Sequence, residues 1–153
     1  MTPISRWSLL AIFAVGLLTA CGNDSGTGPS TPNIAGTWRI TFTNLSGSGV
    51  SCGTTAIDYV ITQSGNTFTG NSGSTYTFSC TDGVNTVSQS ITGAVITNGQ
   101  ITGTSISFDL ATNAAHQTGT LSGNSISGTS TWTLDLGSSG TVVLSGQFGG
   151  LRL

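Results

Sequence analysis

The chain has no lysine and no glutamate, and its charged side chains are three arginines and five aspartates. Helical bundles and coiled coils draw heavily on Ala, Glu, Lys and Leu, so this composition excludes them. Three scattered arginines cannot neutralise a row of phosphates, which excludes nucleic acid as a partner. The hydrophobic fraction of 36% is too high for a charge-rich disordered chain.

Small residues take the place of the missing charges. The 153 residues include 49 serines and threonines and 23 glycines. Threonine is β-branched and favours extended backbone, whereas glycine favours turns and bulges. A chain of this length is expected to form one domain with its own core. We therefore expect a single β-rich domain.

The amino terminus has the pattern expected of an export signal. After Arg6, residues 7–18 (WSLLAIFAVGLL) form an apolar run whose only polar side chain is Ser8. A membrane-spanning helix needs about 20 such residues, whereas a signal peptide needs fewer. The run ends in Leu18-Thr19-Ala20-Cys21, which resembles the lipobox of bacterial lipoproteins. The alternative is a simple secretory signal cleaved near Ala20, which leaves Cys21 as an unpaired thiol.

The lipobox resemblance implies that residues 1–20 are a signal peptide and that Cys21 is the lipid attachment site. Two or more acyl chains anchor a protein stably, so the membrane is the expected partner. By the same resemblance, Gly22 after the cysteine favours the outer membrane, or the outer face of the membrane in a cell that has only one. Residues 21–33 are rich in Gly, Ser and Pro and are expected to form a flexible tether.

Residues 34–153 show the alternation of half-buried strands. Trp38, Ile40 and Phe42 alternate with Arg39 and threonines, which places the apolar side chains on one face. The same pattern recurs at 57–61, 75–80, 106–110, 132–136 and 142–148. We find no convincing helical periodicity, and residues 111–116 are expected to form either a helical turn or a loop.

Three segments share one turn pattern. Residues 64–70, 97–103 and 122–128 each contain Gly-Asn or Asn-Gly, then a large apolar residue, a hydroxyl residue and a glycine. Asn and Gly tolerate the positive φ of tight hairpin turns. The trailing glycines, Gly70, Gly103 and Gly128, are expected where a strand bends or bulges.

These elements predict an all-β fold, an antiparallel up-and-down meander of about eight strands. A closed barrel and a β-sandwich are both compatible with them. Open sheets protect their edge strands with lysine, other charges or proline. The domain has no lysine and no proline after Pro32. Because closure removes the edges, we favour the barrel.

Gly36-Thr37-Trp38 at the start of the first strand resembles the Gly-X-Trp motif of lipocalin-like and avidin-like barrels, the calycin group. The resemblance implies that Trp38 lies at the closed end of the barrel and packs on the incoming chain. It also implies a barrel that binds a small apolar ligand or lipid. The biotin contacts of avidins cannot be assigned to residues of this chain.

Alternation points four large aromatic residues to the inner face, namely Trp38, Tyr59, Tyr76 and Trp132. They would line a ligand pocket or fill the core of a small barrel. The same chain suits a second function class, a structural or interaction module of the envelope that contacts polysaccharide or another protein. An integral outer-membrane barrel fits less well, because one face of the strands is Thr and Ser.

Cys52 and Cys80 are expected to form a disulfide, because an exported domain lies in an oxidising compartment. With one histidine in the chain, a metal site lacks ligands and none is expected. His116 is also the only residue through which a serine or cysteine triad could run. His116 follows two alanines in an expected loop, where a solvated histidine is the simpler interpretation. We therefore expect no enzymatic activity and no cofactor.

Overall fold

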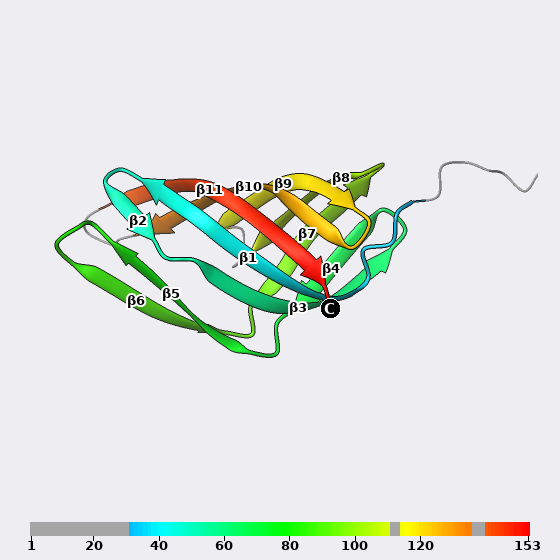
Figure 1. The fold of residues 1–153 in the computed structure, drawn as a ribbon, viewed down its shortest axis with the longest axis horizontal. Coiled ribbons are helices and arrows are strands. Elements are labelled where there is room, and N and C mark those ends of the chain that lie inside the picture. Colours follow the sequence, from blue (N-terminus) through cyan, green and yellow to red (C-terminus); the bar gives the residue numbers. More distant parts are fainter. Residues whose placement is uncertain (1–30, 111–113, 136–139) are drawn as a thin grey trace, which may run out of the picture.

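The computed structural model describes residues 31–110, 114–135 and 140–153, which form an all-β domain (Figure 1). The predicted signal peptide, the lipid attachment site expected at Cys21 and all but the end of the predicted tether lie outside the described residues. The strands are β1 (Gly36–Gly47), β2 (Val50–Cys52), β3 (Thr55–Ser64), β4 (Thr67–Asn71), β5 (Thr75–Thr81), β6 (Thr86–Thr92), β7 (Val95–Thr102), β8 (Ser105–Leu110), β9 (Ala115–Ser122), β10 (Ser125–Asp135) and β11 (Thr141–Arg152).

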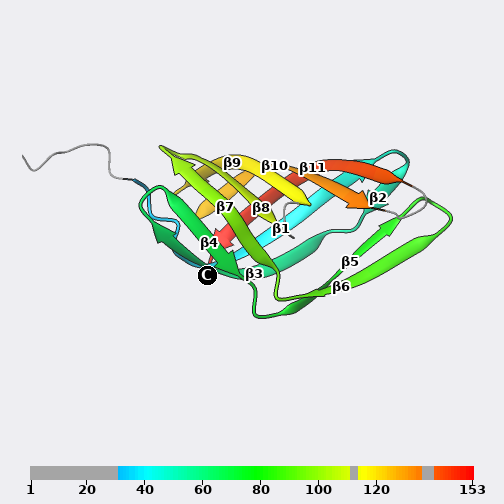
Figure 2. The same cartoon turned by 180° about the vertical axis from the view of Figure 1, so that it is seen from behind.

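Eight of these strands close into an antiparallel barrel. They follow one another around it in the order β1, β3, β4, β7, β8, β9, β10 and β11, and β11 pairs back onto β1. This confirms the predicted closed barrel, and the sandwich alternative is wrong. The up-and-down order is interrupted by two insertions, the short strand β2 and the hairpin β5–β6. Both lie outside the barrel wall in the two views (Figures 1 and 2).

The predicted alternation is confirmed, and it turns a continuous apolar face into the barrel. Trp38, Ile40 and Phe42 of β1 are at most 1% exposed, whereas Arg39 between them is exposed. Aromatic rings contact one another across the interior, with Phe42 edge-on to Trp132 at 5.6 Å and Phe108 edge-on to Phe148 at 5.5 Å. Burial of one such side chain stabilises the fold by about 1.5–3 kcal/mol.

Two of the three predicted turns are confirmed. Gly65-Asn66 and Gly123-Asn124 connect adjacent strands, and both glycines have φ of +58°. The prediction for Asn98-Gly99 is wrong, because these residues lie within β7, where the pairing register shifts. Asn98 takes the positive φ of a bulge there, +52°.

The trailing glycines differ from one another. Gly103, expected at a bend, has φ of +56° in the tight turn between β7 and β8. Gly70 lies where the pairing of β4 with β7 shifts register, as predicted for a bulge. Gly128 allows close packing instead, because a Cβ atom there would lie 2.1 Å from the carbonyl oxygen of Thr118.

The two ends of the barrel are built differently. One end, called the closed end here, bears the tight turns 65–66, 103–104 and 123–124. The second residue of each turn accepts a backbone hydrogen bond from a neighbouring strand. The incoming chain and the carboxyl terminus lie at this end as well (Figure 1). The opposite end, called the hairpin end here, bears the β1–β2 turn and the insertion β5–β6.

Candidate functional site

Trp38 lies at the closed end, where the Gly-X-Trp motif predicted it. Its indole Nε1 donates a hydrogen bond to the carbonyl oxygen of Ile34, 2.7 Å away, in the chain that enters the barrel. The guanidinium of Arg152 lies 4.9 Å from the ring centroid, a cation–π contact, and donates to the carbonyl oxygen of Ala35. Trp38 is fully buried, so it joins the incoming chain to the end of β11.

Trp132 lies toward the hairpin end and is covered by the hairpin β5–β6. The ring of Phe78 on β5 stacks on the indole, with centroids 5.2 Å apart and planes 12° from parallel. The indole Nε1 donates to Oγ of Ser130, which also accepts a hydrogen bond from Nε2 of Gln117. The side chains of Ser130 and Gln117 are buried, and Trp132 is 3% exposed. The hairpin thus closes over a polar network inside the barrel.

Tyr59 and Tyr76 lie where the hairpin meets β3. Tyr59 is fully buried, and its hydroxyl has no hydrogen-bond partner among the described residues. Burial raises the pKa of Tyr59, helped by the nearby Tyr76, whose own pKa burial also raises. Both phenols therefore stay protonated at any physiological pH.

The four predicted pocket residues do not share one open cavity in the described part of the chain. Trp38 is at the closed end, Trp132 lies beneath the hairpin, and both are enclosed. Tyr76 lines a depression of about 300 Å³ beside Ile57 and Asp58. A larger depression, about 600 Å³, lies on the outer wall over β1, β10 and β11 and is lined mainly by outward-facing residues.

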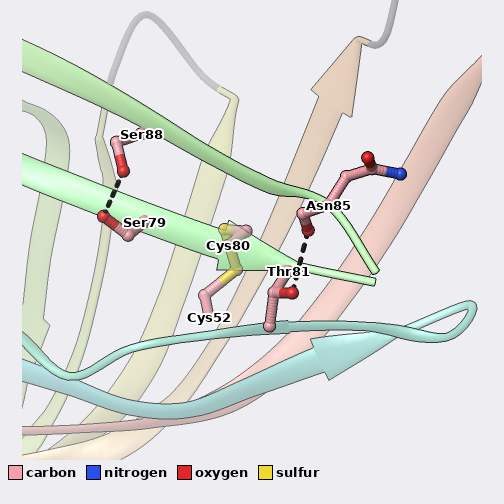
Figure 3. The surroundings of a disulfide bond; sticks show 6 residues. All are labelled: Cys52, Ser79, Cys80, Thr81, Asn85 and Ser88. Carbon is pink, nitrogen blue, oxygen red and sulfur yellow. Dashed lines mark hydrogen bonds between the residues drawn. A yellow bond between two sulfur atoms is a disulfide. The ribbon is translucent and has the colours of Figure 1, made fainter. Parts of the chain in front are cut away.

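The disulfide between Cys52 and Cys80 is confirmed, and it fastens the hairpin to β2 (Figure 3). The two cysteines are direct partners in the short β2–β5 ladder. On the adjoining part of the hairpin, Ser79 and Ser88 share a hydrogen bond of 2.7 Å across the strands. Phe78 and the disulfide therefore hold the same strand at two neighbouring positions.

Two hydrogen-bonded pairs that each include an aspartate lie on the outer wall. Arg39 and Asp58 are direct cross-strand partners and form two hydrogen bonds of 2.8 Å. The hydrogen bonds and charge of Arg39 hold the pKa of Asp58 below its usual value. Both side chains are exposed, so this pair contributes little to stability.

The second pair joins Asp109 and His116. The His116 Nδ1 atom lies 2.6 Å from Oδ1 of Asp109, and Asn98 Nδ2 donates to the other carboxylate oxygen. These donors, Asn98 first, keep the pKa of Asp109 low. The loop or helical turn expected at His116 is wrong, since the residue belongs to β9. Its ring is 60% exposed, and among the described residues no hydroxyl is hydrogen-bonded to it.

The sequence did not reveal that the hairpin β5–β6 packs on the barrel through Phe78 and Trp132. Phe78 was expected on an inner face, but its stacking partner Trp132 is more than fifty positions away along the chain. No sequence signal distinguished β5 from the barrel strands, because it has the same alternation of apolar and hydroxyl residues. The 23 residues between β4 and β7 can be recognised as an insertion only once it is known that β4 pairs with β7.

In residues 31–110, 114–135 and 140–153, no group of three or more His, Cys, Asp or Glu side chains is placed to hold a metal ion. The same residues contain no helix that is long and apolar enough to cross a membrane. Comparison of the chain with protein families, with curated proteins and with solved structures found no match.

Proposed function

We propose that this protein is a lipid-anchored lipoprotein of the cell envelope whose barrel is a non-enzymatic interaction module. The observation that carries the proposal is the packed interior. Aromatic residues of β1, β4, β8, β10 and β11 fill the barrel, and Phe78 closes over them. A carrier of small ligands needs an interior cavity of several hundred cubic ångströms. With the interior packed, a partner would meet the outer surface.

The anchor follows from the lipobox resemblance at Leu18-Thr19-Ala20-Cys21. The position of Trp38, packed on the incoming chain at the closed end, supports the likeness to calycin barrels. Because the tether joins the barrel at the closed end, a lipid on Cys21 would leave the hairpin end free to point away from the bilayer. The tether's typical reach is only about 20 Å, so the domain would stay near the membrane surface.

The anchor is tested by membrane fractionation of cells that express the full-length chain. Cys21→Ser is expected to move the protein from the membrane to the soluble fraction, because the acceptor thiol is lost. Asn23→Ser, which leaves the lipobox intact, serves as the control and should stay with the membrane. Retention of Cys21→Ser in the membrane would overturn the lipid anchor.

A second candidate is the binding of a small apolar ligand under the hairpin. The buried hydroxyl of Tyr59 has no partner, and the neighbouring Tyr76 lines the depression beside Ile57. Displacement of the hairpin would open a route to both tyrosines. Titration of the Cys21→Ser protein with a hydrophobic fluorescent probe, read by tryptophan fluorescence, separates the candidates. A saturable change favours the ligand site, and its absence favours the packed module.

A further inference from the structure

Strand β6 has an unpaired backbone edge. It pairs with β5 on one side, and within the described residues no strand pairs with its other side. In both views β6 forms the outer margin of the hairpin (Figures 1 and 2). Closure removes the edges of the barrel itself, but the insertion restores one. An exposed edge is a template for pairing with another strand.

The usual protection of an edge strand is missing from β6. The sequence TVSQSIT of residues 86–92 has no charged residue and no proline, and neither a bulge nor a register shift interrupts its pairing with β5. Val87 is 70% exposed on this strand, and Val84 in the adjoining turn is 89% exposed. In natural sheets charges, prolines and bulges prevent edge-to-edge association. Their absence makes this edge suited to a partner strand.

The sequence of β6 also identifies the partner. TVSQSIT reads almost the same in both directions about Gln89, with Ser88 matching Ser90, Val87 matching Ile91 and Thr86 matching Thr92. Two antiparallel copies centred on Gln89 would place each residue opposite a residue of the same type, except that valine would lie opposite the similar isoleucine. A twofold interface needs this self-complementarity. No like charges would meet, because the strand has none.

The free backbone groups fit the same register. The Gly53 amide donates to the carbonyl oxygen of Ser79, so the backbone groups of Ser79 face β2. Ser88 lies opposite Ser79, and by the alternation of an antiparallel ladder its own amide and carbonyl face the free edge. Ser90 has the same orientation. In the symmetric register Ser88 of one copy would exchange both hydrogen bonds with Ser90 of the other.

We propose that β6 pairs antiparallel with β6 of a second copy of this chain, centred on Gln89, so that the β5–β6 hairpins of two protomers form one four-stranded sheet. Val87 would contact Ile91 of the second copy in a pair without hydrogen bonds, where side chains lie closest. The hydroxyl pairs on the other face, such as Ser79 with Ser88, would continue across the interface. One strand pair buries less than the roughly 1,200 Å² of a stable complex. Confinement of both copies to one membrane would raise their effective concentration and favour the pairing.

Cysteine cross-linking of the full-length protein in its membrane tests the register. Gln89→Cys would place two thiols directly opposite each other, with Cα atoms about 4.5 Å apart, within the geometry of a disulfide. A covalent dimer is therefore expected on a non-reducing gel. Val84→Cys is the control. It is more exposed, but in this register its two copies lie roughly ten residues apart along the strands at about 3.3 Å each, so it should give little dimer.

A second substitution tests the backbone pairing. Ser90→Pro in the Gln89→Cys chain removes an amide that faces the free edge, so it breaks the intermolecular ladder and spares the bonds to β5. Loss of the cross-linked dimer is expected, while the intact Cys52–Cys80 disulfide reports that the hairpin is folded. The proposal is overturned if Gln89→Cys cross-links no better than Val84→Cys, or if the proline leaves the yield unchanged. A cross-linked product of another mass would also overturn it, by assigning the edge to a strand of a different protein. Lipidation of Cys21 is read separately, from membrane fractionation of the Cys21→Ser variant, so the failure of one proposal can be told from the failure of the other.

Discussion

Replacing Cys52 and Cys80 by serine is expected to destabilise the domain by about 3.5 kcal/mol. The cysteines are 28 positions apart in the chain, and a cross-link over a loop of this length removes that much conformational entropy from the unfolded state at 25 °C, in the chain-entropy account. Natural domains are stable by only about 5–15 kcal/mol. The loss is therefore a large part of the total.

The structure predicts where the loss is felt first. Without the disulfide, β2 is joined to β5 by a ladder of two residue pairs, and the stacking of Phe78 on Trp132 becomes the main attachment of the hairpin. The barrel strands keep partners on both sides. Amide hydrogen exchange in β5 and β6 should therefore accelerate more than in β1 or β11.

Both effects can be measured on chains that carry Cys21→Ser, so that no other thiol is present. Equilibrium denaturation in urea gives the free energy of unfolding, and hydrogen exchange read by mass spectrometry gives the local opening. The single variants Cys52→Ser and Cys80→Ser under reducing conditions are the controls for side-chain effects. A loss below about 1 kcal/mol, or uniform acceleration of exchange over the whole barrel, would refute this role for the disulfide.

Three further predictions test the packing and the charges. Phe78→Ala should cost about 3–5 kcal/mol in thermal or urea unfolding, because it removes the ring that stacks on the buried indole; a loss near zero would mean that the hairpin is not docked. Gly99→Ala should cost about 1–3 kcal/mol, because the added Cβ would lie 2.2 Å from the carbonyl oxygen of Phe68, whereas Gly73→Ala, with open space around it, should be neutral in the same assay. The lowered pKa of Asp109 means that its stabilising contribution is complete above the ordinary carboxyl value of 3.8 and is lost as the pH falls through the lower folded value. Asp109→Asn should therefore flatten the stability profile below pH 3.8, measured by urea midpoints; an unchanged profile would contradict the assignment.

Strand alternation and closure could be predicted because they depend on local patterns. The spacing of Trp38, Ile40 and Phe42 identified both the strand and its buried face. The scarcity of charge favoured a fold without edges, and eight strands do close. That reasoning did not predict the free edge of β6. The hairpin β5–β6 lies outside the barrel because β4 pairs with β7, and its own composition does not reveal this pairing.

The turns show where local pattern is insufficient. Asn98-Gly99 has the sequence of a hairpin turn, yet it lies in the middle of β7, and the turn falls at Gly103. Both sites need positive φ, so local propensity fits either one. The choice depends on the pairing of β7 with β4 and β8, which places Gly99 against the backbone of Phe68.

The sequence alone determined the fold class, the inward faces, the disulfide partners and the expectation of a lipid anchor, since each depends on a short motif or a two-residue period. Tertiary structure alone decided what the aromatic residues do. Trp38 and Trp132 have the same inward orientation in the sequence pattern, but one joins the incoming chain to the end of β11 and the other stacks beneath an inserted hairpin. Alternation fixes the face of a strand on which a side chain lies, whereas the contacts it makes depend on strands that are distant in the sequence and meet only when the barrel closes.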